Sequence, residues 1–385
     1  MSIAAPLLAL ALLAAGPAGE EPAGAPETMN APPARAARDR GIAWLAAAQN
    51  ADGSWCTGVV EGVLEMGFPP AAYYAWKVAA SAIACLALLE VEETPAVRSA
   101  LDRGLAWLCA AESPRRGADW DVDHVWGALY GFAACVEAAR DPRFAAADWP
   151  ARLREAGGRY LAILERTQSP RGGWGYYDDP IYSKRPKWDT SFCTALVLPA
   201  LAAGVEMGWV DDPRILVRAR GYVSRCALPN GAYGYDLDLV PRMGAIAGGE
   251  HIDAVPGSLG RVQVCNWGLA RAGERKITPD RVREGLEAFL RHHRFLDVAW
   301  TKPVPHEAFY YNSGYFYAFG HYYAAEAIQL LPEAEREAWH ARLRPHLVRR
   351  QRADGSLADF LLGSYTSVAC TAFLVLALDL GLPAP

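Results

Sequence analysis

The sequence predicts an all-α protein built as a closed (α/α)6 toroid of six helical hairpins. A sequence block that ends in a turn recurs six times at a spacing of roughly 60 residues, and such a period indicates stacked copies of one supersecondary unit. Each block is followed by a segment of helical length that is apolar on nearly every side, and such a helix must be buried all round. An inner ring of six helices satisfies this requirement, whereas an open superhelix would leave one face of its inner layer in water.

Each hairpin begins with a half-polar helix and continues with an apolar one. The clearest block covers 40–55, where apolar residues recur at helical spacing and Asp52-Gly53 favours a tight turn. Weaker copies cover 103–120, 157–174, 220–235, 284–300 and 344–357. The apolar helices are expected at about 74–91, 122–139, 190–203, 259–271, 313–331 and 366–380.

The block at 40–55 carries the pattern Arg-Gly-x-x-Trp-Leu-x-x-x-Gln-x-x-x-Gly-x-Trp, which resembles the QW repeat of squalene and oxidosqualene cyclases. Gln351 and Asp354-Gly355-Ser356 form a second good copy, and the middle copies are degenerate. The resemblance extends over 36–380 and implies the toroid of terpenoid cyclases and protein prenyltransferases. The glycine permits a sharp turn and the tryptophan supplies an apolar wedge between hairpins, so we expect the Gln-Trp pairs to be structural.

Composition and the N-terminal residues indicate an exported protein, periplasmic or extracellular. Residues 1–19 are apolar and of signal-peptide length, 20–35 are expected to form a disordered lead-in, and 36–385 a single toroid domain. The formal net charge is −5 with no long basic or acidic run, which argues against a nucleic-acid partner. The later apolar segments are too short and too interrupted to predict a transmembrane span, and peripheral contact with a membrane stays open.

The cysteines are distributed by layer. Five lie one to an apolar helix, where cysteine is a small packing residue: Cys85, Cys135, Cys193, Cys265 and Cys370. The other three lie in or near the half-polar blocks and are better candidates for disulfide pairing: Cys56, Cys109 and Cys226.

The connections that lead into the apolar helices are long and chemically rich. In a closed ring they all emerge at one end, where their carboxylates, imidazoles and aromatic rings predict a binding cleft for a small apolar ligand or a glycan. The candidate ligand-binding residues are Trp174, Tyr176, Tyr177, Asp189, Tyr235, His306, Tyr310, Tyr311, His321 and Tyr365.

The strongest catalytic candidate is Asp121-Val122-Asp123-His124, at the start of an apolar helix. It resembles the Asp-x-Asp-Asp motif of class II terpenoid cyclases, which implies that Asp123 is the acid that protonates an alkene. Such an acid needs a raised pKa, which burial or the neighbouring Asp121 can supply. His124 stands where the family has aspartate. A charged His124 would lower the pKa of Asp123, whereas a neutral His124 would hold the acid's proton in place. The alternative is that Asp123 caps the helix, and we weigh capping slightly ahead of catalysis.

A metal site is not expected. Protein prenyltransferases hold zinc with Asp-x-Cys and a later histidine, but Asp189 and Cys193 are four residues apart here, so the resemblance implies no metal and no cofactor. Asp189 is instead expected to cap a helix. His321 is expected in the core, with a role in the central cavity left open. The other histidines of the C-terminal half are expected at the surface: His292, His293, His340 and His346.

Three functions remain open. Squalene cyclases hold their substrate between two toroids, so a single toroid implies a smaller polyprenoid. A glycosidase or polysaccharide lyase would use tyrosines to stack sugars and paired groups for acid–base work. Its candidates are Asp178-Asp179, Asp236-x-Asp238, His251-x-Asp253 and His306-Glu307, with Arg261 to neutralise an acidic sugar. The third hypothesis is that the protein is a binding module without catalytic activity.

Overall fold

The computed structural model describes residues 27–61, 70–116, 123–176, 188–237, 252–300, 306–359 and 364–383. The helices of this part of the chain are α1 (Ala31–Ala47), α2 (Pro70–Glu90), α3 (Pro95–Ala110), α4 (His124–Arg140), η2 (Pro142–Phe144), α5 (Trp149–Thr167), α6 (Ser191–Glu206), α7 (Arg214–Arg225), η3 (Val255–Gly257), α8 (Leu259–Arg271), α9 (Pro279–Arg291), α10 (Arg294–Trp300), α11 (Phe316–Ile328), α12 (Glu333–Arg350) and α13 (Ser364–Asp379).

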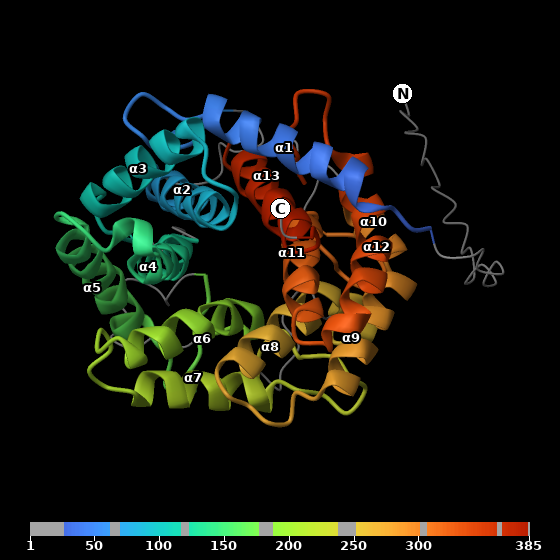
Figure 1. Cartoon of the computed structure of the whole chain (residues 1–385). Coiled ribbons are helices and arrows are strands. Elements are labelled where there is room, and N and C mark those ends of the chain that lie inside the picture. The colour runs from blue at the N-terminus through green and yellow to red at the C-terminus, as the bar shows by residue number, and fades with distance from the viewer. Residues whose placement is uncertain are drawn as a thin grey trace, which may run out of the picture.

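The helices form two concentric layers around a central axis (Figure 1). The inner layer consists of α2, α4, α6, α8, α11 and α13, and each of these helices contacts the next along the chain. The last inner helix, α13, packs against the first, α2, which closes the ring. The outer layer holds α1, α3, α5, α7, α9, α10 and α12. Within the described residues, the predicted all-α toroid is confirmed.

Burial follows the apolar pattern of each helix. In α6 every residue from Ser191 to Leu198 is buried, because this inner helix has protein on all sides. In the outer helix α9 only one stripe is buried, formed by Val282, Gly285, Leu286 and Phe289 at spacings of three and four residues. The contrast predicted from sequence therefore separates the two layers.

Three of the recurring turns share one set of hydrogen bonds. In each, the glutamine amide donates to the carbonyl oxygen of the turn glycine and to a carbonyl oxygen of a neighbouring outer helix, α3, α7 or α1. The bonds are Gln49 to Gly53 and Ala100 (2.8 and 2.8 Å), Gln168 to Gly172 and Ile215 (2.8 and 2.9 Å), and Gln351 to Gly355 and Ala37 (2.9 and 2.8 Å). The last of these ties the sixth hairpin to the first, so the same device that links consecutive hairpins also closes the outer layer.

Replacing Gly172 by alanine should destabilise the fold by at least about 2 kcal/mol. Gly172 has a φ of +104°, and a Cβ there would lie 2.5 Å from the carbonyl oxygen of Arg218. The matched control is Gly158→Ala in α5, where no atom lies within 4 Å of the new Cβ and the free energy of unfolding should rise by about 0.5–1 kcal/mol. Urea denaturation of both variants measures the difference. Equal stability of the two variants would contradict this account of the turn.

The N-terminal helix begins earlier than expected. The predicted lead-in runs to residue 35, but α1 starts at Ala31, with proline in its first turn. The segment is held against the C-terminal hairpin: the Met29 N–H donates to the Ala341 carbonyl (2.8 Å), and Arg38 pairs with Asp379 (2.6 Å). The expected signal peptide, 1–19, lies outside the described residues.

The packing also bears on the membrane and disulfide expectations. One helix, α2, is long and apolar enough to cross a membrane by length and composition alone, but 83% of its most apolar window is buried in the protein, so the expectation of no transmembrane span is not overturned. All eight cysteines are unpaired, including the three proposed as candidates for disulfides: Cys56, Cys109 and Cys226. The five cysteines of the inner helices are buried packing residues, as predicted.

Candidate functional site

Asp123 immediately precedes α4 and has a left-handed backbone conformation, with φ 69°. This conformation is uncommon for a residue other than glycine. Its side chain makes no capping hydrogen bond to α4. Instead, Oδ2 accepts a hydrogen bond from the indole Nε1–H of Trp76 on α2, at 3.0 Å. The capping interpretation is therefore wrong. The carboxyl group bonds to an indole of the neighbouring inner helix and not to the backbone N–H groups of α4.

The surroundings of Asp123 favour its protonated form. Desolvation raises the pKa of Asp123 to about 7, and it outweighs the opposing hydrogen bonds from Trp76 and Trp126. The side chain keeps some accessible surface, yet protein atoms enclose it closely enough to remove most of its hydration. Near neutral pH a large fraction of the molecules therefore carries a proton on this carboxyl group.

Aromatic rings surround this carboxyl group. Trp76 stacks on Tyr365 with ring centroids 4.5 Å apart, and Trp126 stacks on Tyr176 at 6.3 Å. We call the following set the aromatic cluster: Tyr73, Trp76, Trp126, Tyr176, Trp188, Phe192, Tyr235, Tyr315, Phe316 and Tyr365. Five inner helices contribute to it near their N-terminal ends, so it lies at the end of the ring where the long connections enter.

The aromatic cluster also has a polar edge. The hydroxyl groups of Tyr176 and Tyr235 are 3.0 Å apart and hydrogen bonded. The guanidinium group of Arg261 lies over the Tyr235 ring at 5.5 Å and donates to the Tyr233 carbonyl at 3.2 Å. Arg261 is almost fully buried and 3.5 Å from Asp253. Hydrogen bonds and the guanidinium group of Arg261 thus fix this edge of the cluster.

The structure brings together part of the predicted site. Tyr176, Tyr235 and Tyr365 join Asp123 in the aromatic cluster, as the predicted clustering of the long connections implies. His124, which follows Asp123 and begins α4, is buried. Asp121 and Tyr177 lie outside the described residues.

Trp174 and Asp189 are occupied by the fold. Trp174 is fully buried, and its indole N–H donates to the carbonyl of Leu164 at 2.8 Å. Asp189 is also fully buried; it pairs with Arg171 at 2.6 Å and accepts a hydrogen bond from Ser169. It therefore ties the start of α6 to the turn that follows α5 and is not the cap expected from sequence. The expected ligand-binding role fits neither residue.

The segment that follows α10 folds against the outer layer. His306 is exposed and pairs through its backbone with Ser313. Tyr310 packs edge-on against Phe295 of α10 with ring centroids 4.6 Å apart, and Tyr311, half-buried, has a left-handed φ of 58°. The buried carboxylate of Glu307 accepts three backbone N–H bonds of this segment, from Phe309, Tyr310 and Asn312. Tyr310 thus packs on α10.

Three of the four histidines that were expected at the surface are largely covered by protein. His293 and His340 are each 3% exposed, and His346 is half-buried, so the expected surface positions are wrong. His321 is fully buried, as expected, but its ring contacts His293 and His346 of the outer layer. Its place is therefore between the layers, which corrects the suggested role in the central cavity.

A second candidate site lies at the opposite end of the ring and was missed from sequence. A cavity of about 380 Å³ opens between the C-terminal ends of the inner helices. It is lined by charged residues in the last turns of these helices: Glu90, Glu137, Glu206, Glu326, Arg140 and Arg271. Burial raises the pKa of Glu326 to about 7, although the Tyr322 hydroxyl donates to its carboxylate at 3.0 Å. One or two charged residues near the end of each apolar helix were the available signal.

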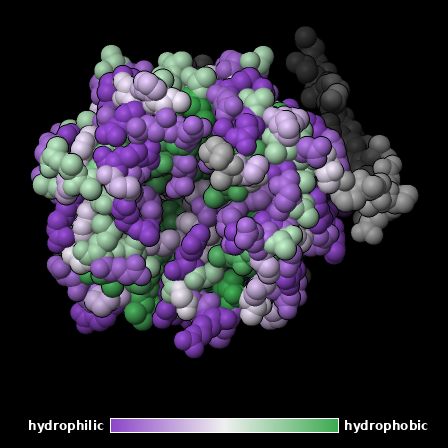
Figure 2. Space-filling view, in the orientation of Figure 1, coloured by the Kyte–Doolittle hydropathy of each residue, from purple (hydrophilic) through white to green (hydrophobic). Residues whose placement is uncertain are grey.

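Aromatic contacts connect the two ends of the ring interior. Trp126 of the aromatic cluster stacks on Tyr130, one turn further along α4, with centroids 6.0 Å apart. Tyr130 contacts Phe373 of α13 at 6.2 Å, and both rings line the cavity. Figure 2 shows polar residues around the ring and apolar residues deeper toward its centre. The interior is thus aromatic from Asp123 to the cavity.

The sequence matches no protein-family model and no curated protein. Solved structures share its fold. A type II terpene cyclase from Scytonema has 15% sequence identity and a TM-score of 0.53, covering 91% of this chain and 98% of its own. An α-1,6-mannanase from Salegentibacter has 11% identity and a TM-score of 0.55, covering 90% and 98%. An unsaturated glucuronyl hydrolase from Streptococcus agalactiae has 12% identity and a TM-score of 0.58, covering 91% and 92%. At these identities the likeness establishes an α/α toroid fold and no particular activity.

Proposed function

We propose that this toroid binds a polyprenoid in its aromatic interior and that Asp123 protonates one of its alkenes. The observation that carries the proposal is a carboxyl group with a pKa of about 7, hydrogen bonded to an indole and surrounded by aromatic rings. An acid that transfers a proton to carbon must be protonated before it acts, and burial keeps it so. Aromatic faces then stabilise the positive charge that forms.

The reaction would be an isomerisation that consumes no cofactor. The alkene π electrons take the proton from a carboxyl oxygen of Asp123, which leaves a carbocation and a carboxylate. Internal alkenes then attack the cation and close rings, and a carbon next to the final cation loses a proton to water, which ends the sequence. The Asp123 carboxylate takes a proton back from water, so the net reaction is an isomerisation. Trp76 and Trp126 stabilise the carboxylate by hydrogen bonding and face the cation with their rings.

The presence of a single toroid supports a substrate smaller than squalene. This chain forms a single toroid, so its ligand has to fit one ring interior. A terpene cyclase of the same fold has been solved with geranylgeranyl dihydroxybenzoate as its substrate, at 14% identity to this chain. We therefore propose a geranylgeranyl-sized prenyl chain as the ligand of this toroid.

Prenyl binding should depend on the aromatic cluster. Trp126→Leu is expected to weaken binding of geranylgeraniol roughly tenfold, because one wall of the cluster is lost. The matched control is Trp107→Leu on the outer helix α3, where the ring lies under Lys77, 5.3 Å from its centroid. Isothermal titration calorimetry gives both dissociation constants. Equal affinity of the two variants, or no binding to the wild-type protein, would contradict the proposal.

The cavity at the opposite end supports a second candidate, a glycan-processing enzyme. A protonated Glu326 and a second carboxyl group of the cavity lining would supply the acid and base of glycoside hydrolysis, and Trp267 and Tyr322 would stack against sugar rings. The calorimetric experiment separates the two functions when a mannotetraose titration is added. Binding of the sugar without binding of the prenyl alcohol favours this candidate.

A further inference from the structure

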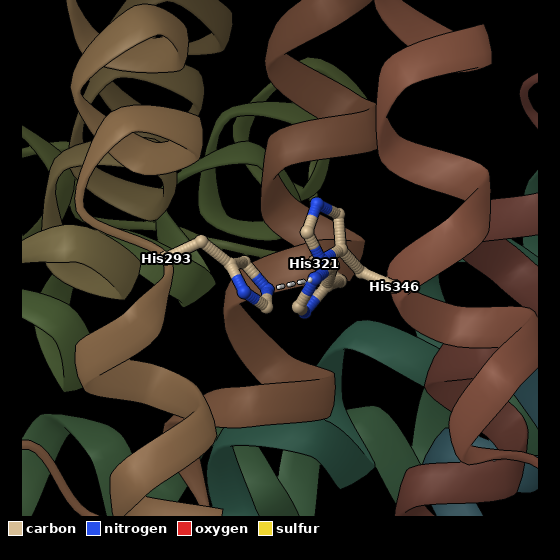
Figure 3. Close-up of side chains that lie close together, drawn as sticks. All are labelled: His293, His321 and His346. Carbon is tan, nitrogen blue, oxygen red and sulfur yellow. Dashed lines mark hydrogen bonds between the residues drawn. The ribbon is translucent and has the colours of Figure 1, made fainter. Parts of the chain in front are cut away.

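Three histidines from separate elements converge between the two layers (Figure 3). His293 lies between α9 and α10, His321 in the inner helix α11, and His346 in the outer helix α12. One ring nitrogen of each lies within 4.8 Å of the others. The Nε2 atoms of His293 and His321 are 3.0 Å apart, and the His346 ring lies 3.7 Å from that of His293, centroid to centroid.

The hydrogen bonds of the other ring nitrogens fix the protons of this group. His321 Nδ1 is 2.7 Å from the carbonyl oxygen of Tyr317, which accepts only, so Nδ1 carries the proton. His293 Nδ1 is 2.9 Å from the carboxylate of Asp297. The Asp297 carboxylate also pairs with the Arg350 guanidinium at 2.7 Å, and an ionised carboxylate only accepts hydrogen bonds. In the neutral rings, both Nε2 atoms therefore present lone pairs to each other.

Two lone pairs at 3.0 Å repel unless a cation lies between or beside them. We propose that His293, His321 and His346 bind a divalent transition-metal ion of the zinc class. Zinc takes imidazole nitrogens at about 2.0–2.1 Å, so two ligands at a tetrahedral angle are roughly 3.3 Å apart, close to the separation found here. Three imidazoles leave one position for water or another ligand.

The surroundings have the features of an outer shell for a metal. The Asp297 carboxylate orients His293 through Nδ1, and the Tyr317 carbonyl orients His321, which are the partners that metal-bound histidines usually have. Arg350 carries a charge that opposes a cation, but it pairs with Asp297 at 2.7 Å, so the two charges offset each other.

The ion would join the outer layer to the inner one. Its ligands come from the α9–α10 turn, α11 and α12, so it would link the fifth and sixth hairpins. Such a site stabilises the folded state, because the unfolded chain does not hold the three rings together. This inference concerns the space between the layers and is independent of the function proposed for the ring interior.

The test uses the full chain, purified without a polyhistidine tag and stripped with a chelator. Zinc should then bind with one equivalent in calorimetry and raise the melting temperature with the logarithm of its free concentration. Cobalt(II) should give the strong visible absorption of a tetrahedral site. Absence of both signals in the wild-type protein would overturn the proposal and leave a proton shared between His293 and His321.

Variants locate the site. His346→Gln removes the half-buried ligand and should abolish the zinc-dependent rise in melting temperature. The control is His340→Gln on the same helix, where a buried histidine is hydrogen bonded to Gln329 at 2.9 Å and lies outside the cluster. That variant should keep the full response to zinc. An unchanged response of His346→Gln, or loss of response in His340→Gln alone, would contradict the assignment.

Discussion

Asp123→Asn is expected to lower turnover of a geranylgeranyl-type substrate by about 10²–10⁴-fold, the usual contribution of a positioned general acid. Asparagine keeps an oxygen that can accept the hydrogen bond from Trp76, so the local packing is preserved while the transferable proton is lost. Mass spectrometry of the extracted products gives the initial rates. Binding of the prenyl alcohol should change little, which separates loss of chemistry from loss of the site.

The rate should also depend on pH with a definite sign. The protonated form of Asp123 is the active one, so wild-type turnover should be constant below pH 7 and fall about tenfold per unit above it, given a pKa of about 7. The residual activity of Asp123→Asn should lack this decrease. A rate that rises through this range would exclude Asp123 as the acid.

Stability supplies a second readout that needs no substrate. The pKa of Asp123 in the folded state, about 7, lies above the unfolded value of 3.8. Its contribution to stability is therefore complete below pH 3.8 and is lost as the pH rises through about 7. The loss is at most about 4 kcal/mol, from a shift of about three units at 1.36 kcal/mol each. The melting temperature of Asp123→Asn minus that of the wild type should consequently be larger at pH 8 than at pH 5.

Glu326→Gln is the control for both measurements. Burial raises the pKa of Glu326 to about 7 as well, but at the other end of the ring. The two variants should shift the pH dependence of stability in the same direction, while only Asp123→Asn removes prenyl turnover. Loss of activity on a glycan in Glu326→Gln alone would instead assign the chemistry to the cavity.

The architecture could be predicted because burial depends on average composition over many residues. Six nearly apolar segments require a layer shielded on every side, and the packing of α13 against α2 provides it. The recurring turn was predictable for the same reason: only glycine suits the positive φ of Gly53 and Gly355. These constraints are local or repeated, and so they appear in a single sequence.

The site was predictable only in part, because it depends on backbone angles and on pairing between distant elements. An aspartate before a helix normally caps it; the left-handed φ of Asp123 that prevents this has no marker in the sequence. From sequence, Trp76 and Phe192 could not be recognised as residues of the site, because a buried aromatic ring is equally expected in core packing. His293, His321 and His346 meet only because hairpin stacking brings three segments together.

The second large effect is expected at the tryptophan of the first turn. Trp55→Ala should lower the free energy of unfolding by about 3–5 kcal/mol, the usual cost of deleting a fully buried aromatic ring. Trp55 is fully buried and packs on Gly104 of α3, where an added Cβ would lie 2.6 Å from its ring. It therefore fills the space between the first two hairpins, and denaturant unfolding measures the loss.

The indole N–H has a separate role that a second variant isolates. It donates to the Leu45 carbonyl at 2.8 Å, one of the last carbonyls of α1, which have no partner within the helix. Trp55→Phe keeps most of the wedge and loses this bond, so it should cost only about 1–2 kcal/mol. Trp149→Ala, at a partly exposed tryptophan that begins α5, is the control and should cost less than Trp55→Ala. If Trp55→Phe were as damaging as Trp55→Ala, the hydrogen bond to α1 rather than the wedge between hairpins would account for the stabilisation.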